Sequence, residues 1–192
     1  MIESLESLDR QLVLFINGLH NGVLDEIMWF FSGSFILIPL FIMVFWSLYR
    51  TYSPKQVIIS FLAILLVVAL ADLSSVYLFK EVFMRYRPSH HTELIGQLHF
   101  YELSDNQFYR GGLYGFVSSH AANYFGILTV CWTLSKHKWI KISVLIITCI
   151  ILLSRVYLGV HYVSDIICGA ILGALIAKII LHFLILKHMS RA

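Results

Sequence analysis

Long apolar runs limit what this chain can fold into more than any other feature of its sequence. Four runs are near or above the roughly 20 residues that a helix needs to cross a bilayer: 27–49, 56–79, 139–157 and 162–186. A fifth, 121–135, is shorter but gains length if its helix begins near Ser118. Backbone groups in lipid must pair within their own segment, so such runs predict helices. The predicted fold is an all-α integral membrane bundle with about five transmembrane helices in a single domain, 1–192.

The composition agrees with a membrane protein. Hydrophobic residues make up 59% of the chain and charged residues 13%, against about 45–50% and about 25% in soluble domains. The cysteines, Cys131, Cys149 and Cys168, all fall within apolar runs, so free, buried thiols are expected. No basic stretch interleaved with aromatic residues indicates nucleic-acid binding. Membrane lipids are the expected surroundings.

The N-terminal segment, 1–22, predicts an amphipathic helix rather than a signal peptide. Its start carries acidic residues, where a signal peptide carries basic ones. Apolar residues recur at helical spacing, with the charges on the other side: Leu5, Leu8, Leu12, Phe15, Ile16 and Leu19. Two placements stay open for this helix, at the membrane surface or packed against the bundle.

The ends of the apolar runs divide by charge. Three ends carry basic residues and no acidic ones: Arg50, Lys55, Lys136, Lys138, Lys141, Lys187 and Arg191. The positive-inside rule makes this face cytoplasmic. The opposite face receives the N-terminus, segment 80–118 and the turn at 155–162. We therefore expect a protein of the plasma (inner) membrane whose chemistry faces away from the cytoplasm.

A cluster on the outer face begins at Ser154-Arg155 and continues through His161 to Asp165. Residues four apart share a helix face, so Asp165 can orient the imidazole of His161, as an activated nucleophile requires. Arg155 can bind a phosphate with two parallel hydrogen bonds. The long apolar run that follows places His161 near a helix N-terminus, which attracts anions.

Two further clusters fall on the same face. Lys80 and Arg87 are seven apart, which predicts one helix face, with Pro88 ending the helix. The other is Val117-Ser118-Ser119-His120, which offers hydroxyls, N–H groups and an imidazole at a helix start. Alone, each cluster has a structural explanation, such as an interface lysine or a helix cap. Together on one face they indicate a phosphoryl group.

The three clusters resemble a known family. The motifs K-x6-RP, S-x-H and SR-x5-H-x3-D, in this order, are similar to those of the type 2 phosphatidic acid phosphatase superfamily. Those membrane lipid phosphatases share a helical core with vanadium haloperoxidases. The resemblance covers roughly 56–186 and implies a phosphatase that needs no metal or other cofactor.

The resemblance also implies a role for each matching residue. His161 would be the nucleophile that forms a phosphohistidine, Asp165 its orienter, and His120 the general acid. The phosphate cradle would consist of Lys80, Arg87, Ser118 and Arg155, with Ser119 supplying its backbone N–H. The second motif departs from the family's PSGH at Val117 and Ser119, and serine adds a side chain beside the phosphate. The family core commonly has six spans, so the N-terminal helix would stand in for the sixth or be a remnant of it.

Two segments lie outside the motifs. The 89–117 loop is long for a structureless connection, so we expect a lid or specificity element. Its adjacent His90 and His91 cannot share a helix face and lack a nearby carboxylate at ligand spacing, so no metal site is predicted. Asp72 lies within a span, where a charged residue is a functional hypothesis by default. A structural hydrogen bond is the interpretation favoured for it.

The leading functional hypothesis is a lipid phosphatase acting on the outer face. Candidate substrates are a polyprenyl diphosphate, a lipid A phosphate, phosphatidylglycerol phosphate and phosphatidic acid, and the headgroup stays open because the cradle contacts only phosphate. A phosphotransferase that passes the phosphoryl group to another lipid is the alternative. A haloperoxidase is disfavoured by the five spans and the absence of a soluble domain. A non-catalytic transporter or scaffold would show no turnover.

Overall fold

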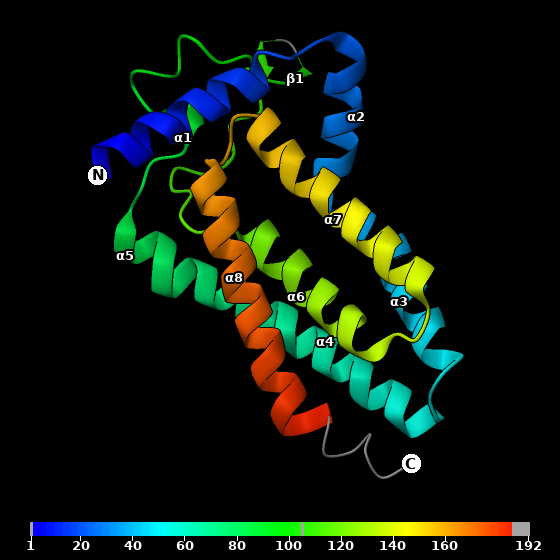
Figure 1. Ribbon diagram of the computed structural model, residues 1–192. Coiled ribbons are helices and arrows are strands. Elements are labelled where there is room, and N and C mark those ends of the chain that lie inside the picture. The colour runs from blue at the N-terminus through cyan, green and yellow to red at the C-terminus, as the bar shows by residue number, and fades with distance from the viewer. Residues whose placement is uncertain (1, 105, 186–192) are drawn as a thin grey trace.

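The computed structural model describes residues 2–104 and 106–185 as a helical bundle with one helix lying across its end (Figure 1). That crossing helix is α1, Ile2–Asn17. The remaining α-helices are α2 Gly22–Ser32, α3 Leu37–Tyr49, α4 Pro54–Ser74, α5 Glu81–Phe83, α6 Ser119–Leu134, α7 Lys138–Tyr157 and α8 Val163–Ile180. Two π-helical segments extend α4 and α8: η2 Ser75–Lys80 and η4 Leu181–Ile185. The predicted helical membrane fold is confirmed.

Among the described residues, three continuous helices are long and apolar enough to cross a membrane: Pro54–Phe83, Lys138–Tyr157 and Val163–Phe183. The helix α6 begins after its N-cap Ser118, as expected, but has only 16 residues. At a rise of about 1.5 Å per residue it is shorter than the roughly 30 Å hydrocarbon core. The number of spans therefore stays a prediction.

The helix predicted over 27–49 is two helices instead of one. Helix α2 ends at Ser32, and Gly33 takes an extended backbone with φ −74° and ψ 146°. A 3₁₀ turn, Ser34–Ile36, then leads into α3, and the pair is bent by 61°. A Cβ at position 33 would lie 2.4 Å from Cε1 of the Phe35 ring, so a residue without a side chain fits this bend. The bend matters for function because Ser34 and Leu37 line the cavity described below.

Glycines bring α6 and α8 together. A Cβ on Gly173 would lie 1.9 Å from the carbonyl oxygen of Ala122, and one on Gly169 would lie 2.5 Å from that of Ser118. Small residues at helix contacts let membrane helices approach closely. The two helices begin at the same end of the bundle, where the Ser118 N–H donates to the carbonyl oxygen of Asp165 at 3.1 Å. Their N-termini therefore form one wall of the site.

Of the two placements left open for the N-terminal helix, the structure shows packing against the bundle, and contact with the membrane surface stays a prediction. Helix α1 packs against α7 and α8 (Figure 1), with Val13 fully buried. Part of the predicted apolar stripe faces outward, with Leu5, Leu8, Phe15 and Leu19 all more than half exposed. An exposed apolar stripe on a helix at the bundle's end suits contact with the membrane surface.

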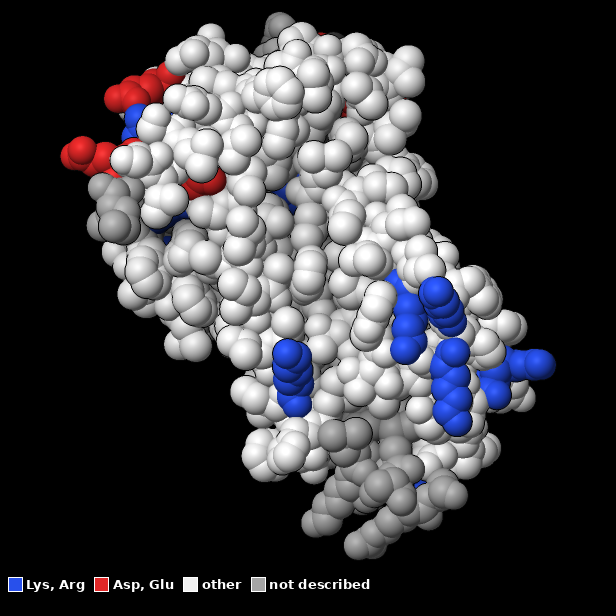
Figure 2. Space-filling view, viewed as in Figure 1, with Lys and Arg blue, Asp and Glu red and all other residues white. Residues whose placement is uncertain are grey.

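Charge is segregated along the molecule. Lysine and arginine side chains gather at one end and acidic ones at the other (Figure 2). At the basic end, Arg50 lies over the Trp46 ring at 5.9 Å and Lys141 over Trp132 at 5.8 Å, an arrangement typical of a membrane interface. The tail residues Lys187 and Arg191, used in the topology prediction, lie outside the described residues.

The cysteines are free, as expected, but not all are buried. Cys131 is buried and Cys168 half-buried, whereas Cys149 is exposed. Cys149 points outward from α7, the side that lipid would cover, so the apolar run around it does not imply burial within the protein. The prediction of three buried thiols is wrong at this position.

The described part of the 89–117 loop packs against the bundle. It contains a 3₁₀ turn, Pro88–His90, and two short strands, β1 Glu102–Ser104 and β2 Gln107–Phe108. The side chain of Asn17 in α1 donates to the carbonyl oxygen of His99 and accepts from its N–H, both at 2.8 Å. Asn17 also donates to the carbonyl oxygen of Tyr157 at 2.7 Å. One buried amide thus ties the loop to α1 and to the end of α7.

Candidate active site

A cavity of about 450 Å³ opens between η2, the start of α6, the end of α7 and the bend after α2. It is lined by most of the predicted site residues: Lys80, Arg87, Ser119, His120, Arg155 and His161. Ser118 and Asp165 lie behind this lining and are fully buried. The bundle therefore brings together three motifs that are far apart in the sequence.

His161 lies in the turn between α7 and α8, just before the helix that begins at Val163. Its backbone N–H and that of Val160 both donate to the carbonyl oxygen of Arg155, at 3.2 and 3.1 Å, which ties the turn to the end of α7. The imidazole is 1% exposed. Its Nδ1 lies 3.4 Å from Asp165 Oδ2, and its Nε2 lies 3.1 Å from Arg87 Nη1.

These two contacts fix the tautomer of His161. A guanidinium has donors and no acceptor, so Nε2 accepts from Arg87 and Nδ1 carries the proton facing Asp165. Burial, and then the positive charges of Arg87, Arg155 and Lys80, hold the pKa of His161 well below its usual range. The imidazole is therefore neutral at neutral pH. Its Nε2 lone pair faces Arg87, which lines the cavity, and an unprotonated nitrogen there is what a nucleophile for phosphorus requires.

Arg87 reaches the cavity from a loop and not from the helix that carries Lys80, which corrects the prediction of a shared helix face. The helix ends at Phe83, because Met84 takes a left-handed backbone with φ 45°. Arg87 is extended, as a residue before proline prefers. Its Nε donates to the carbonyl oxygen of Tyr114 at 3.1 Å. Burial and then Arg155 lower the pKa of Arg87 to about 10, so it stays charged.

Arg155 is held by residues that the motifs do not include. It is 3% exposed, and its two terminal nitrogens donate to Ser32 and, at 2.9 Å, to the hydroxyl of Tyr109. Its Nε is buried without a hydrogen-bond partner among the described residues. Buried donors without a partner are costly. The side chain is therefore anchored at one end and has a free donor to offer.

The serine that replaces glycine in the second motif binds Lys80. Ser119 Oγ accepts from Lys80 Nζ and lies 2.6 Å from Ser75 Oγ, so its hydroxyl joins α6 to η2. The hydroxyl of Ser118, in contrast, caps α6 by accepting from Ala121 N at 3.3 Å. Ser119 lines the cavity and Ser118 does not. The Ser118 side chain thus forms a helix cap, and the place of Ser118 in the phosphate cradle stays a prediction.

Acceptor groups occupy the part of the cavity further inside the bundle. Asp72 lines this part, about two helical turns from Lys80, and Val76 lies between the two along the helix. Within the described chain its carboxylate forms no hydrogen bond, so the structural hydrogen bond favoured from the sequence is absent. Asn123 Oδ1 is buried there without a partner among the same residues. His120 and Tyr124 continue the lining on α6.

Two residues next to the site were missed by the sequence analysis. Arg85 donates to Asp165 Oδ1 at 2.8 Å and to Asp9 Oδ2 at 2.9 Å. Arg85 falls within the first motif, between its lysine and its arginine, which is the only sequence signal it carries. Asp9 lies in the N-terminal helix, and no spacing relates it to the motifs.

A larger and more open hollow of about 720 Å³ lies over the outer loop. Its lining includes Asp25, Glu26 and Glu102, with Arg110 as a basic residue. Carboxylates at this density repel an anion. The cavity around His161 is therefore the site suited to phosphate.

Comparison with known proteins agrees with this geometry. The sequence model of the PAP2 superfamily matches residues 57–188, which contain all three motifs. The chain belongs to the PAP2 superfamily. It is a membrane lipid phosphatase, a hydrolase, as the motifs predicted.

Two curated relatives share most of the chain. A lipid A 4'-phosphatase of Bacteroides thetaiotaomicron is 34% identical over 173 residues, which cover 90% of this chain and 75% of the relative. A lipid A 4'-phosphatase of Porphyromonas gingivalis is 28% identical over 179 residues, covering 93% and 74%.

Two solved structures share the fold. A PAP2-type phosphatidylglycerolphosphate phosphatase from Bacillus subtilis superposes with a TM-score of 0.68, at 24% identity, covering 98% of this chain and 89% of that one. Aquifex aeolicus LpxE gives a TM-score of 0.61, also at 24% identity, covering 90% and 94%. The integral membrane fold is thus shared along nearly the whole chain, α1 included in the first case.

Proposed function

We propose that this protein hydrolyses a phosphate monoester of a lipid A-type lipid on the extracytoplasmic face, through a phosphohistidine on His161. The observation that carries the proposal is the buried imidazole of His161, held between Asp165 and Arg87 beside a cationic cavity. Cations and fixed donors stabilise the charge that develops on a transferring phosphoryl group. The reaction needs no metal ion.

In the first step His161 Nε2 attacks phosphorus and the bond to the leaving oxygen breaks. Arg87 Nη1, freed from Nε2, turns to a phosphoryl oxygen, and Lys80 and Arg155 Nε donate to the others. Burial and then Arg155 hold the pKa of His120 well below its usual range, so His120 takes up its proton together with the anionic phosphate, whose charge favours the imidazolium. His120 then gives this proton to the leaving alcohol, since an unprotonated alkoxide is a poor leaving group. The products are the lipid alcohol and phosphohistidine.

In the second step water replaces the alcohol. His120, now neutral, takes a proton from the water as its oxygen attacks phosphorus, and the P–N bond breaks. Inorganic phosphate leaves and both histidines return to their starting states. A phosphotransferase would differ only here, with a lipid hydroxyl in place of water.

The inner part of the cavity favours one class of substrate among those the sequence left open. Asn123 Oδ1 is a buried acceptor without a partner in the described chain, and the exposed Asp72 carboxylate lines the same cavity. The two suit hydroxyl and amide N–H donors next to the phosphate. A glucosamine headgroup of the lipid A type offers both. In a diphosphate, the second phosphate, bonded directly to the first, would lie against the Asp72 carboxylate, a like-charge contact. The names of the two curated relatives point to the same substrate class.

A substrate panel tests this proposal. Purified protein is assayed for inorganic phosphate release from lipid A, phosphatidic acid, phosphatidylglycerol phosphate and undecaprenyl diphosphate. We expect lipid A to be the best substrate and the diphosphate to be poor. Asp72→Asn should raise kcat/KM for the diphosphate relative to lipid A by on the order of tenfold, because one like charge is removed.

Other results of the panel would contradict specific parts of the proposal. Equal use of the diphosphate and lipid A by the wild type would contradict the substrate class. An unchanged ratio in Asp72→Asn would contradict the role of Asp72. Loss of lipid phosphate without release of inorganic phosphate would indicate the phosphotransferase.

The proposed orientation follows from the basic end of the bundle. With Arg50, Lys55 and the lysines at 136–141 in the cytoplasm, the cavity opens on the other side of the plasma (inner) membrane. Cysteines introduced in a variant lacking native cysteines should differ in labelling by an impermeant thiol reagent added to spheroplasts. Thr92→Cys should react and His137→Cys should not. The reverse pattern would overturn the orientation.

A further inference from the structure

The contacts behind His161 extend beyond the motif residues. Asp165 Oδ2 accepts from the backbone N–H of Tyr162 at 3.0 Å and faces His161 Nδ1. Its other oxygen, Oδ1, accepts from Arg85 at 2.8 Å. The carboxylate is fully buried, so its direction depends on these few partners. Arg85 thus holds the oxygen opposite the one that orients the nucleophile.

Arg85 is itself fixed from three sides. Its Nη1 also donates to Ser164 Oγ at 2.7 Å, and its Nη2 donates to Asp9 Oδ2 at 2.9 Å. The guanidinium lies over the Tyr162 ring at 4.1 Å, a cation–π distance. Burial opposes its charge, but Asp165 and Asp9 outweigh burial and raise the pKa of Arg85. A charged, immobile guanidinium is what orienting a carboxylate requires.

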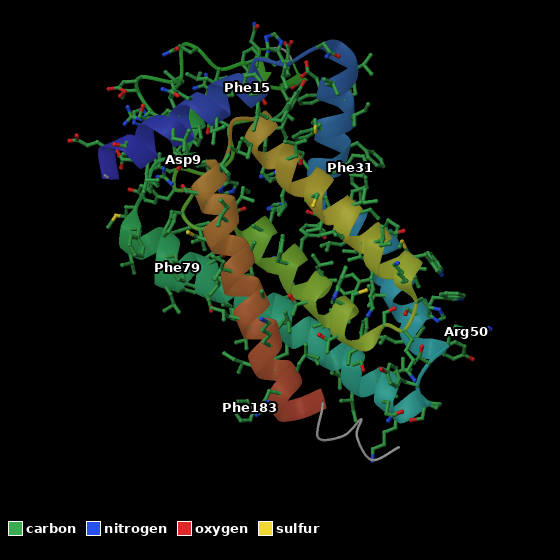
Figure 3. The ribbon with its side chains drawn as sticks, viewed as in Figure 1. Asp9, Phe15, Phe31, Arg50, Phe79 and Phe183 are labelled. Carbon is green, nitrogen blue, oxygen red and sulfur yellow. The ribbon has the colours of Figure 1, made fainter. Side chains whose placement is uncertain are left out.

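Asp9 brings the N-terminal helix into this arrangement. Its side chain is 8% exposed and lies under α1, beside the start of α8 (Figure 3). Oδ1 accepts from the backbone N–H of Ser164 at 3.0 Å, and Oδ2 also accepts from the Ser164 hydroxyl. A carboxylate at a helix N-terminus stabilises that end of the helix. Asp9 therefore contacts both Arg85 and the helix turn that carries Asp165.

We propose that Arg85 and Asp9 are positioning residues that hold Asp165, and through it His161, in the orientation needed for attack on phosphorus. The N-terminal helix α1 then contributes to catalysis, because it supplies Asp9. The inference rests on the proposed role of His161 as nucleophile. Neither residue lines the cavity, so neither is expected to contact substrate.

Kinetics of variants separate positioning from simple stabilisation of the fold. Asp9→Asn keeps the size of the side chain but removes the charge facing Arg85. We expect kcat to fall about tenfold with KM within twofold of wild type. The loss should be equal for a lipid phosphate and for p-nitrophenyl phosphate, because orientation of the nucleophile affects attack whatever the leaving group. A purely structural cap would lower the melting temperature and leave the kcat of folded protein unchanged.

Arg85 variants test the other contact. Arg85→Gln should lower kcat on the order of 100-fold, because Asp165 loses its charged partner. Arg85→Lys keeps the charge but cannot span both carboxylates, so its kcat should lie between Arg85→Gln and wild type. Arg10→Ala is the matched control, since it removes an exposed ion pair to Glu93 from the neighbouring position of α1. Its kcat should stay within twofold of wild type.

A double-mutant cycle decides whether Asp9 acts through Arg85. If it does, adding Asp9→Asn to Arg85→Gln causes no further loss, and the kcat of the double variant matches that of Arg85→Gln. Losses that multiply, or Asp9→Asn and Arg85→Lys variants with wild-type kcat, would overturn the inference. If the variants that carry Arg85→Gln do not fold, Asp9→Asn and Arg85→Lys still decide. Their kcat values are compared with that of the wild type, and the loss in each should be equal for the two substrates. A wild type without turnover on either substrate would overturn the proposed function, and this inference with it.

Discussion

His161→Ala should lose turnover on every substrate, whereas His120→Ala should lose it only where the leaving group needs a proton. The first variant has no nucleophile, so we expect kcat to fall on the order of 10⁴-fold or more with either a lipid phosphate or p-nitrophenyl phosphate. The second should slow the lipid phosphate by roughly 10²–10⁴-fold. The p-nitrophenolate leaves without protonation, and that substrate should be largely rescued.

Both histidine variants are measured on both substrates. Rescue of His161→Ala by p-nitrophenyl phosphate, with no rescue of His120→Ala, would mean that the two roles are reversed. Equal loss in both variants on both substrates would mean that His120 does not act on the leaving group. The melting temperature of each purified variant shows whether the comparison is between folded proteins.

Arg155→Ala should have the next largest effect. Its Nε is a buried donor without a partner in the described chain, and its side chain lines the cavity. Removing one such donor to a developing oxyanion costs roughly 2.7–4 kcal/mol, or about 10²–10³ in kcat. Arg155→Lys keeps the charge but not the planar donor set, so a substantial loss should persist.

Arg50→Ala is the control for that experiment. Arg50 also lies at the end of an apolar segment, but at the basic end of the bundle, where it is exposed beside Trp46 (Figure 3). Its kcat should stay near that of the wild type. Equal losses in Arg50→Ala and Arg155→Ala would mean that the phosphate cradle has been assigned to the wrong end of the molecule.

The sequence predicted the parts of the site that depend on local spacing. His161 and Asp165 are four apart, and the turn before α8 is short enough to keep them in contact even though His161 precedes the helix. The helix cap at Ser118, which the sequence offered as the structural alternative to a phosphate contact, is also local. In each case the interacting groups lie within one turn of chain, so tertiary packing could not separate them.

Contacts made by packing could not be predicted in the same way. The left-handed residue Met84 ends the helix early, so Arg87 enters from a loop, and no spacing rule indicates this. Asp9 is 76 positions from Arg85, and only the crossing of α1 over the start of α8 brings them together. Gly33 was visible in the sequence, but glycine is tolerated in membrane helices, so its presence did not predict a 61° bend.

Trapping of the covalent intermediate tests the central proposal most directly. Purified protein is mixed with a ³²P-labelled lipid phosphate, quenched with alkali within the first turnover, and examined for protein-bound label. The wild type should carry label that is stable in alkali and released by acid, as phosphohistidine is. His161→Ala should carry none. Acid-labile label that persists in His161→Ala, or turnover by the wild type with no trapped intermediate under any quench time, would contradict nucleophilic catalysis by His161.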